Sequence, residues 1–240
     1  MTKYEKFVES LYKMSEKELK EYYKFLRSKR DEISQKIADI MYKYNIADGL
    51  MDISKVDGVK LQRELKSEII TITNVVGEKE VDLTEDILTL VVKDTFKYWN
   101  YNIGFEDVQK ILKDKFKGKH FSDRIWENES KVSNKLNSQI KDFINGKVNV
   151  NQIKREIEKT FNNGAYNTKR LVETEVGRVH DESFKRFCRE TGVSKIKRNA
   201  VLDSKTCDDC SQYDGKIYAL DDAPVLPQHP MCRCFYEIVE

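Results

Sequence analysis

Apolar residues recur at helical spacing in the first part of the chain, and lysines and glutamates fill the positions between them. Such a pattern is typical of an amphipathic helix that buries one face. Ser15 and Glu18 form a capping-box pattern, in which the serine hydroxyl accepts a backbone amide and the glutamate reaches back. We therefore predict a long, core-forming helix that begins at Ser15. Its apolar positions are Leu19, Tyr22, Tyr23, Leu26, Ile33, Ile37, Ile40, Met41 and Tyr44.

A connection and two helices are predicted next. Residues 45–58 carry two glycines and several aspartates, which favour a loop. Residues 59–76 are interpreted as a helix, although the β-branched run 69–76 is also compatible with a strand. Asp82 or Thr84 is expected to cap the following helix.

The second half of the helical region is predicted to contain four helices, separated by glycines and asparagines. A short helix is expected after Gly104, and the next helix should begin at Ser122 and end at Gly146. A third helix should begin after Asn149 or Asn151 and end at residues 162–164, and the last should span residues 165–190.

The pattern changes after Gly192. Residues 195–202, 216–220 and 235–239 have the composition of strands, and all three prolines of the chain fall in this tail. The predicted fold class is therefore mainly α with a small C-terminal β unit (α+β): a helical body followed by a metal-stapled antiparallel β motif.

The composition suits a globular protein, because 39% of the 240 residues are hydrophobic and 35% are charged. A formal net charge of +2 provides no global attraction to nucleic acid or anionic membranes. Charges interrupt every apolar run too early for a membrane span, and no signal-peptide core is visible. We expect folding in a cytoplasm, where thiols stay reduced.

The strongest chemical signal is a set of cysteines and one histidine in the tail. Cys207 and Cys210 form a C-x-x-C pair, and His229, Cys232 and Cys234 follow later. Two soft-ligand clusters at such a separation predict a closed tetrahedral zinc site. The C-x-x-C pair is expected to supply two ligands, while the three later residues compete for the other two places. Zinc would provide folding energy that so small a β unit lacks.

Other interpretations of the cysteines stay open. A C-x-x-C pair can be a redox dithiol, but no thioredoxin-like strand and helix surround this one. Disulfides could form once the protein leaves the cell. A catalytic metal is disfavoured, because a cysteine-rich ligand set leaves no open position for water. His120 and His180 stand outside the cluster and are expected to be ordinary surface or hydrogen-bonded histidines.

Several motifs together resemble one protein family. Residues 203–210 read D-x-x-T-C-x-x-C, residues 214–216 read D-G-K, and residues 227–234 read P-x-H-P-x-C-R-C. These motifs resemble the C-terminal signature of the Mu F-like phage head-morphogenesis family. Residues 170–175 are similar to the arginine-then-T-E helix of that family, and residues 121–126 to a pattern of minor capsid members.

The resemblance begins at about Asn102 and implies a structural phage protein, not an enzyme. Its expected partners are the portal protein and other head proteins, with no membrane and no small-molecule substrate. It would act in the host cytoplasm during assembly and then in the capsid interior of the virion. The predicted division is an N-terminal helical region of unassigned role (1–101), the helical part of the Mu F-like domain (102–192) and the β unit (193–240).

Charged residues near the tail suggest two further hypotheses. Arg170, Glu173 and Glu175 lie on the helix that carries the motif of residues 170–175. Glu175 or Glu173 is expected to brace the metal-binding β unit against the helical body through Arg198 or Arg233. The alternative is that these charged side chains are simply exposed to solvent. Weak contact with DNA phosphates is a second hypothesis, with a solvated helix end as its alternative. The basic residues concerned are Lys185, Arg186, Arg189, Lys195, Lys197 and Arg198.

Competing functions come from other classes of protein. A metal-dependent nuclease would use His229 with Asp203 or Asp214 around a metal-bound water. The cysteines close that site, and no general base stands at a readable spacing. A toxin-type effector would need a catalytic motif in residues 1–101, where no nucleophile or phosphate-loop motif is found. A free-standing zinc ribbon would not account for the large helical body.

Overall fold

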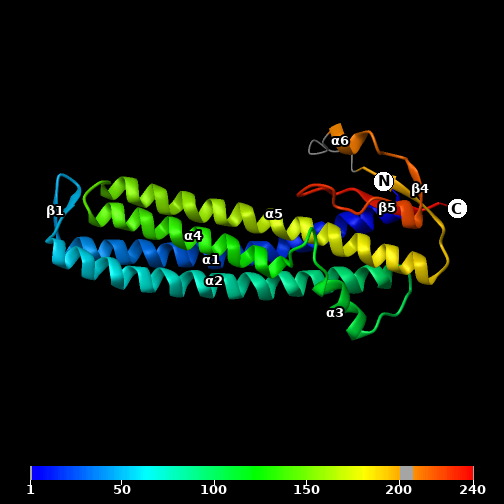
Figure 1. The fold of residues 1–240 in the computed structure, drawn as a ribbon, viewed down its shortest axis with the longest axis horizontal. Coiled ribbons are helices and arrows are strands. Elements are labelled where there is room, and N and C mark those ends of the chain that lie inside the picture. Colours follow the sequence, from blue (N-terminus) through cyan, green and yellow to red (C-terminus); the bar gives the residue numbers. More distant parts are fainter. Residues whose placement is uncertain (1, 201–207, 240) are drawn as a thin grey trace. The chain divides into compact units, whose positions relative to one another are not determined.

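The computed structural model describes residues 2–200 and 208–239. It confirms a mainly α fold with a small C-terminal antiparallel sheet (Figure 1). None of the described helices has a stretch long and apolar enough to cross a membrane. The helices are α1 (Lys3–Lys43), α2 (Lys55–Tyr98), α3 (Phe105–Lys113), α4 (Phe121–Ile144), α5 (Val150–Glu190), α6 (Asp208–Ser211) and the 3-10 turn η1 (Leu220–Asp222); the strands are β1 (Asn45–Ala47), β2 (Leu50–Asp52), β3 (Lys195–Asn199), β4 (Ile217–Ala219) and β5 (Phe235–Ile238).

The chain forms two compact units, each assembled from separate segments. Unit 1 comprises Met1–Leu19, Leu83–Phe121 and Lys169–Glu240, and unit 2 comprises Lys20–Asp82 and Ser122–Thr168. Within each unit, segments that are distant in sequence therefore pack together. The three-part division at residues 101 and 192 stays a prediction.

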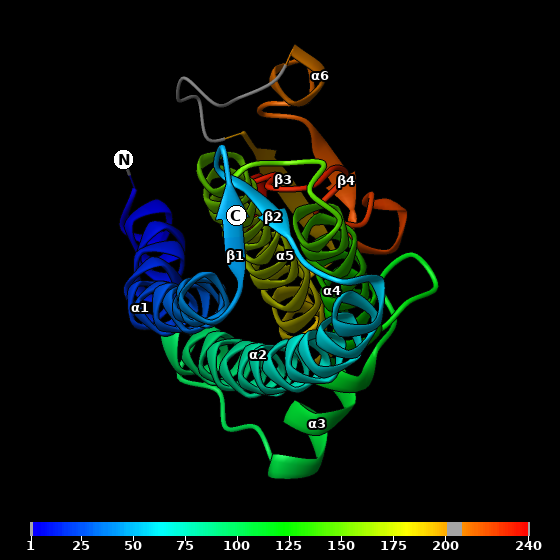
Figure 2. The same ribbon diagram turned by 90° about the vertical axis from the view of Figure 1, so that its left-hand side faces the viewer.

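Unit 2 is a bundle of four helical segments. Parts of α1, α2, α4 and α5 run side by side around a common centre, which Figure 2 shows end-on. A short hairpin, β1 and β2, joins the first two segments, with Ala47 paired to Leu50. Asp48 and Gly49 form its turn with φ of 51° and 79°. Positive φ at both turn residues is what a two-residue hairpin requires, and Asp-Gly supplies it at low cost.

The first helix starts earlier than predicted. It begins at Lys3, where the Thr2 hydroxyl accepts the Glu5 amide at 3.0 Å and the Glu5 carboxylate accepts the Thr2 amide. Ser15 is fully buried inside α1 and donates to the Tyr12 carbonyl at 2.8 Å. The predicted start at Ser15 is wrong because a serine can satisfy its hydroxyl on its own helix, so a local capping pattern does not force a helix end.

The second helix is continuous where a break was predicted. α2 runs through residues 77–84 and through the β-branched run 69–76. Gly77 lies against Trp126 of α4, and a Cβ built on it would be 2.5 Å from the Trp126 Cζ3 atom. This glycine therefore permits close helix packing instead of ending a helix. Thr84 is buried within α2, so the expected cap at Asp82 or Thr84 is wrong.

The fifth helix is also continuous, and the predicted end at residues 162–164 is wrong. Its start is held by Asn149 and not by Asn151. The Asn149 Oδ1 accepts the Gln152 amide at 2.9 Å, and the Gln152 Oε1 accepts the Asn149 amide at 2.8 Å. Two reciprocal bonds of this kind satisfy amides that have no partner inside the helix.

The sheet of unit 1 has the strand order β4-β3-β5 and is antiparallel throughout. Ile196 at its centre is paired with Tyr218 on one side and with Ile238 on the other. The strands lie within the three tail segments predicted from sequence, although residues 201 and 202 of the first segment fall outside the described residues.

One stretch of α5 is buried on all sides. Every residue from Leu171 to Asp181 is buried, including several charged ones. Buried charges are tolerated when they are paired, and this stretch supplies such pairs. The Arg178 Nε lies 2.6 Å from the Glu175 carboxylate, and the Lys185 Nζ lies 3.1 Å from the Asp181 carboxylate. This part of α5 is the centre of unit 1.

Candidate metal centre

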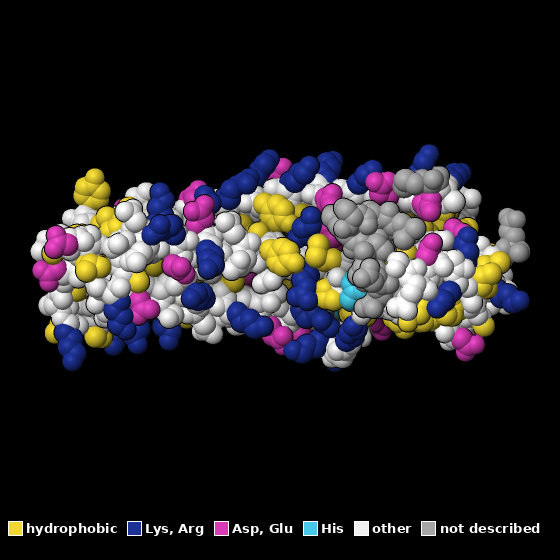
Figure 3. All heavy atoms as spheres, turned by 90° about the horizontal axis from the view of Figure 1, so that it is seen from above, with side chains coloured by type: hydrophobic (Ala, Val, Ile, Leu, Met, Phe, Trp, Pro, Cys, Tyr) yellow, Lys and Arg dark blue, Asp and Glu magenta, His cyan; other side chains and the backbone are white. Residues whose placement is uncertain are grey.

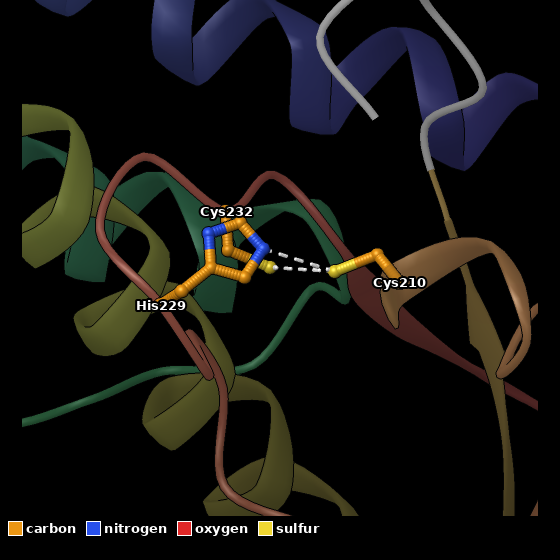
Figure 4. A group of neighbouring side chains, drawn as sticks. All are labelled: Cys210, His229 and Cys232. Carbon is orange, nitrogen blue, oxygen red and sulfur yellow. Dashed lines mark hydrogen bonds between the residues drawn. The ribbon is translucent and has the colours of Figure 1, made fainter. Parts of the chain in front are cut away.

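Three of the predicted ligands meet at one point of unit 1. The ligand atoms of Cys210, His229 and Cys232 all lie within 4.8 Å of one another. Cys210 comes from the short helix α6, whereas His229 and Cys232 come from the loop that precedes β5 (Figure 4). The Sγ atoms of the two cysteines are 3.7 Å apart. The chain thus brings a thiol, a second thiol and an imidazole to face one another.

The imidazole is held in an orientation that suits a metal ligand. The His229 Nδ1 lies 3.0 Å from the Pro230 carbonyl oxygen, which can only accept a hydrogen bond, so the Nδ1 carries the proton. The Nε2 is then the nitrogen that carries the lone pair, and it lies 3.1 Å from the Cys210 Sγ. A backbone bond at the far nitrogen is the usual way in which a ligating histidine is oriented.

Two buried side chains of α5 hold the ligand loop. The Leu226 amide donates to the Asp181 carboxylate at 3.0 Å, and the Met231 amide donates to the Thr174 hydroxyl at 3.0 Å. Met231 has a φ of 61°, which turns the chain before Cys232. Thr174 belongs to the T-E motif of residues 170–175, but the sequence analysis assigned it no role, and it did not single out Asp181.

Cys234 lies beside Cys232 and is one candidate for the fourth ligand. Hydrogen bonding with Cys234 lowers the pKa of Cys232 to about 5, and the same bond together with burial raises the pKa of Cys234. Cys207, the other predicted ligand, lies outside the described residues.

A buried arginine stands beside the thiols. Arg198 on β3 is fully buried, and its Nη2 donates to the Cys210 Sγ at 3.6 Å. Its guanidinium also lies over the ring of Tyr213, 4.8 Å from the centroid. A cation at this place offsets the negative charge that thiolates acquire when they bind a metal.

The donor set fits zinc. Thiolate sulfur and imidazole nitrogen are soft to borderline ligands, which zinc binds in tetrahedral sites, while magnesium and calcium prefer oxygen. Cys210, His229 and Cys232, completed by Cys234 or Cys207, would make a three-cysteine, one-histidine site. Such a site is closed, and its chemistry is structural.

The predicted bracing residues occupy different environments. The Arg233 Nη2 lies 3.4 Å from the carboxylate of fully buried Glu173 and 3.4 Å from that of Glu16. The Glu175 carboxylate is paired with Arg178 of its own helix instead. Arg170 is exposed. Bracing of the ligand loop through Glu173 and Arg233 stays a prediction.

That prediction can be tested with Glu173→Gln. The change keeps the shape of the side chain but removes the charge facing Arg233, so we expect a loss of about 1–3 kcal/mol in the free energy of unfolding. Urea unfolding of the metal-loaded protein would measure it. Glu9→Gln is the control, because Glu9 forms an exposed pair with Lys13 and should cost less than about 1 kcal/mol. Equal stability of the two variants would contradict the bracing.

The basic residues suggested for DNA contact are only partly accessible. Lys185 and Arg198 are buried, so their charges face protein groups and not phosphates. On the face drawn in Figure 3, Lys and Arg side chains are spread widely, with Asp and Glu side chains among them. Of the remaining four, Arg186 pairs with Asp107 and Glu190, Arg189 lies near Asp221, Lys197 pairs with Glu237, and Lys195 is exposed.

The remaining histidines and the fifth cysteine lie apart from the cluster. The His180 Nε2 is 3.0 Å from the Tyr4 hydroxyl, and burial lowers the pKa of His180 to about 4, so it stays neutral. The His120 Nε2 donates to the Leu112 carbonyl at 3.1 Å. Burial raises the pKa of Cys188 to about 12, which leaves an unreactive thiol.

The fold and the site together define a mainly α protein in which unit 1 brings together thiols and an imidazole of the kind that bind zinc. Residues 131–237 match the family model described as Phage Mu protein F like protein, so this part of the chain is similar to the Mu F-like family, as the motifs predicted. The matched region includes α5, the sheet and all the candidate ligands. No curated protein and no solved structure gives a significant match. The family indicates a phage head-related protein.

Proposed function

We propose that this protein is a structural minor component of a phage head, which associates with the portal or the capsid interior during assembly, DNA packaging or ejection. The carrying observation is the family match over residues 131–237, which spans the candidate metal centre and the helix that holds it. The partners are the portal protein and other head proteins, first in the host cytoplasm and then in the virion. DNA remains a weak candidate partner.

The role proposed for the metal is structural. The sheet of unit 1 is small, with strands of three to five residues. A site that ties α6, which lies between β3 and β4, to the loop before β5 would join the two connections between the strands, as structural zinc does in other small β units. A thiol-rich set of four donors supplies folding energy and leaves no place for a reacting water.

The competing enzyme hypothesis finds little support among the described residues. A nuclease was expected to use Asp214 near the metal, but the Asp214 Oδ1 accepts the Ala200 amide at 2.8 Å and serves the backbone. Asp203, the other candidate, lies outside the described residues. A toxin-type effector gains no specific observation from the fold.

The assembly role is tested in the phage that encodes the chain. We expect quantitative mass spectrometry of purified heads to find the protein at a low, fixed copy number. Heads made without it should contain less nuclease-protected DNA or fail to infect. Affinity purification from cells that produce heads should recover the portal protein.

A parallel assay separates the enzyme alternative. Supercoiled plasmid incubated with zinc-loaded protein, with and without added manganese, should remain uncut. Normal, infectious heads that lack the protein, together with metal-dependent cleavage of the plasmid, would overturn the structural proposal in favour of a nuclease.

A further inference from the structure

Unit 2 contains two buried carboxyl groups at neighbouring positions in its core. Glu80 on α2 is 1% exposed, and Glu129 on α4 is 6% exposed. The charge of Glu80 acts on Glu129 and favours its protonated form. We refer to these two residues as the carboxyl pair. Buried carboxylates are normally matched by a cation or by a metal ion, because an unpaired buried charge is costly.

The groups that act on Glu80 from the neighbouring helices are hydroxyls. From α1, the Tyr22 hydroxyl donates to the Glu80 Oε2 at 3.0 Å. From α5, the Thr168 side chain also bonds to Glu80. The Glu129 Oε2 is buried and has no hydrogen-bond partner among the described residues. Within the described part of the chain, no lysine, arginine or histidine contributes to the charge state of either carboxyl.

The space beside Glu129 is too small for a hydrated ion. Tyr22, Thr168 and Gly164 line a cavity there, with apolar side chains over most of its wall. The space open to the centre of a water-sized sphere is about 10 Å³, about the room of one water molecule. A hard divalent cation needs about six oxygen ligands around it, which this cavity does not provide. A proton is the neutralising species that fits.

We propose that the carboxyl pair makes the packing of unit 2 depend on pH: the bundle packs tightly while both carboxyl groups carry a proton and loosens when they ionise. This inference does not depend on the proposed function. Burial raises the pKa of Glu80 to about 7, and burial with the charge of Glu80 raises the pKa of Glu129 to about 8. Tyr22 keeps its proton throughout, because burial raises its pKa well above 10.

The direction of the pH effect follows from linkage. In the unfolded chain both carboxyls lose their protons near the ordinary glutamate pKa of 4.5, whereas in folded unit 2 they keep them to about 7 and about 8. Folding therefore binds protons above the unfolded pKa, so stability falls as pH rises from about 4.5 and levels off above about 8. The three histidines of the chain, at positions 120, 180 and 229, all belong to unit 1.

Hydrogen exchange read by mass spectrometry tests the proposal on the full chain, because peptides report each unit separately. After correction for the intrinsic exchange rate, protection of peptides from Lys20–Asp82 and Ser122–Thr168 should fall at least about tenfold between about pH 5 and about pH 9. Glu80→Gln and Glu129→Gln imitate the protonated groups and should each flatten this dependence. Glu78→Gln is the matched control, since Glu78 is exposed on the same helix as Glu80.

Each alternative outcome has a clear meaning. An equal pH dependence in wild type, both glutamine variants and the control would overturn the proposal. Recovery of protection at high pH on adding calcium or magnesium, in wild type but not in Glu129→Gln, would also overturn it and assign a cation site instead. If the glutamine variants do not fold, infrared spectroscopy of the wild type at neutral pH decides, because the proposal requires the band of a protonated, buried carboxyl.

Discussion

Replacing Cys232 by serine is expected to abolish metal binding and to unfold the tail of unit 1. Cys232 lies within 4.8 Å of the other two ligands, and hydrogen bonding with Cys234 lowers the pKa of its thiol to about 5, so its loss removes a thiolate from the centre of the cluster. Structural zinc sites contribute about 10–16 kcal/mol of apparent binding free energy at neutral pH, most of which would be lost. Elemental analysis and native mass spectrometry should show one zinc per wild-type chain and none in the variant.

Cys188→Ser is the matched control, because Cys188 is buried in α5 outside the cluster. It should keep its zinc even if burial of the hydroxyl lowers stability. Comparing Cys207→Ser with Cys234→Ser then identifies the fourth ligand, since only the ligand's replacement should release the metal. A wild-type chain that carries no zinc, with its thiols free or joined in disulfides, would rule out the structural zinc site and leave the family match as the sole support for the proposed function.

Replacing Arg178 by methionine is expected to destabilise unit 1 by about 3–5 kcal/mol, because it leaves a buried carboxylate without its cation. Arg178 is 4% exposed and lies 2.6 Å from the Glu175 carboxylate. It also donates to the Ile111 carbonyl at 3.0 Å and so joins α5 to α3 within the unit. Methionine preserves much of the side-chain volume, which separates the loss of charge from the loss of packing.

A double-mutant cycle isolates this ion pair. Glu175→Gln alone should also destabilise the protein, while the double variant should be less affected than the sum of the two single changes. Chemical unfolding followed by circular dichroism would supply the free energies. Additive effects would mean that the two residues do not act as a pair, and an unchanged midpoint in Arg178→Met would contradict the buried position of the guanidinium.

The candidate site could be predicted largely from sequence because its signal is chemical. Cysteine and histidine at short spacings have few other uses in a reducing compartment, so residue type and spacing marked Cys207 and Cys210 as ligands and left His229, Cys232 and Cys234 as competing candidates. The same spacing does not show what holds them. Thr174 and Asp181 orient the ligand loop through side-chain bonds to its backbone, and Arg198 supplies the neighbouring charge. These residues are far from the ligands along the chain.

The local elements were predictable where the signal was local. Asn149 with Gln152 caps α5, and Gly146 with a φ of 66° follows α4, because caps act through bonds to adjacent backbone. The errors came where the same residue types serve packing. Gly77 is small because the ring of Trp126 lies against it, and Ser15 is buried inside a helix that begins much earlier.

Hydrophobic periodicity and composition thus predicted a mainly helical chain with a small β tail and a thiol-rich candidate metal site, since those features depend on neighbours in sequence. Only the tertiary structure decided which charges are buried. Glu80, Glu129, Glu175 and Arg178 look like ordinary solvent-facing residues of charged helices, yet all four lie inside a unit. Burial depends on helices brought together from separate segments, and that assembly leaves little trace in the spacing of any one of them.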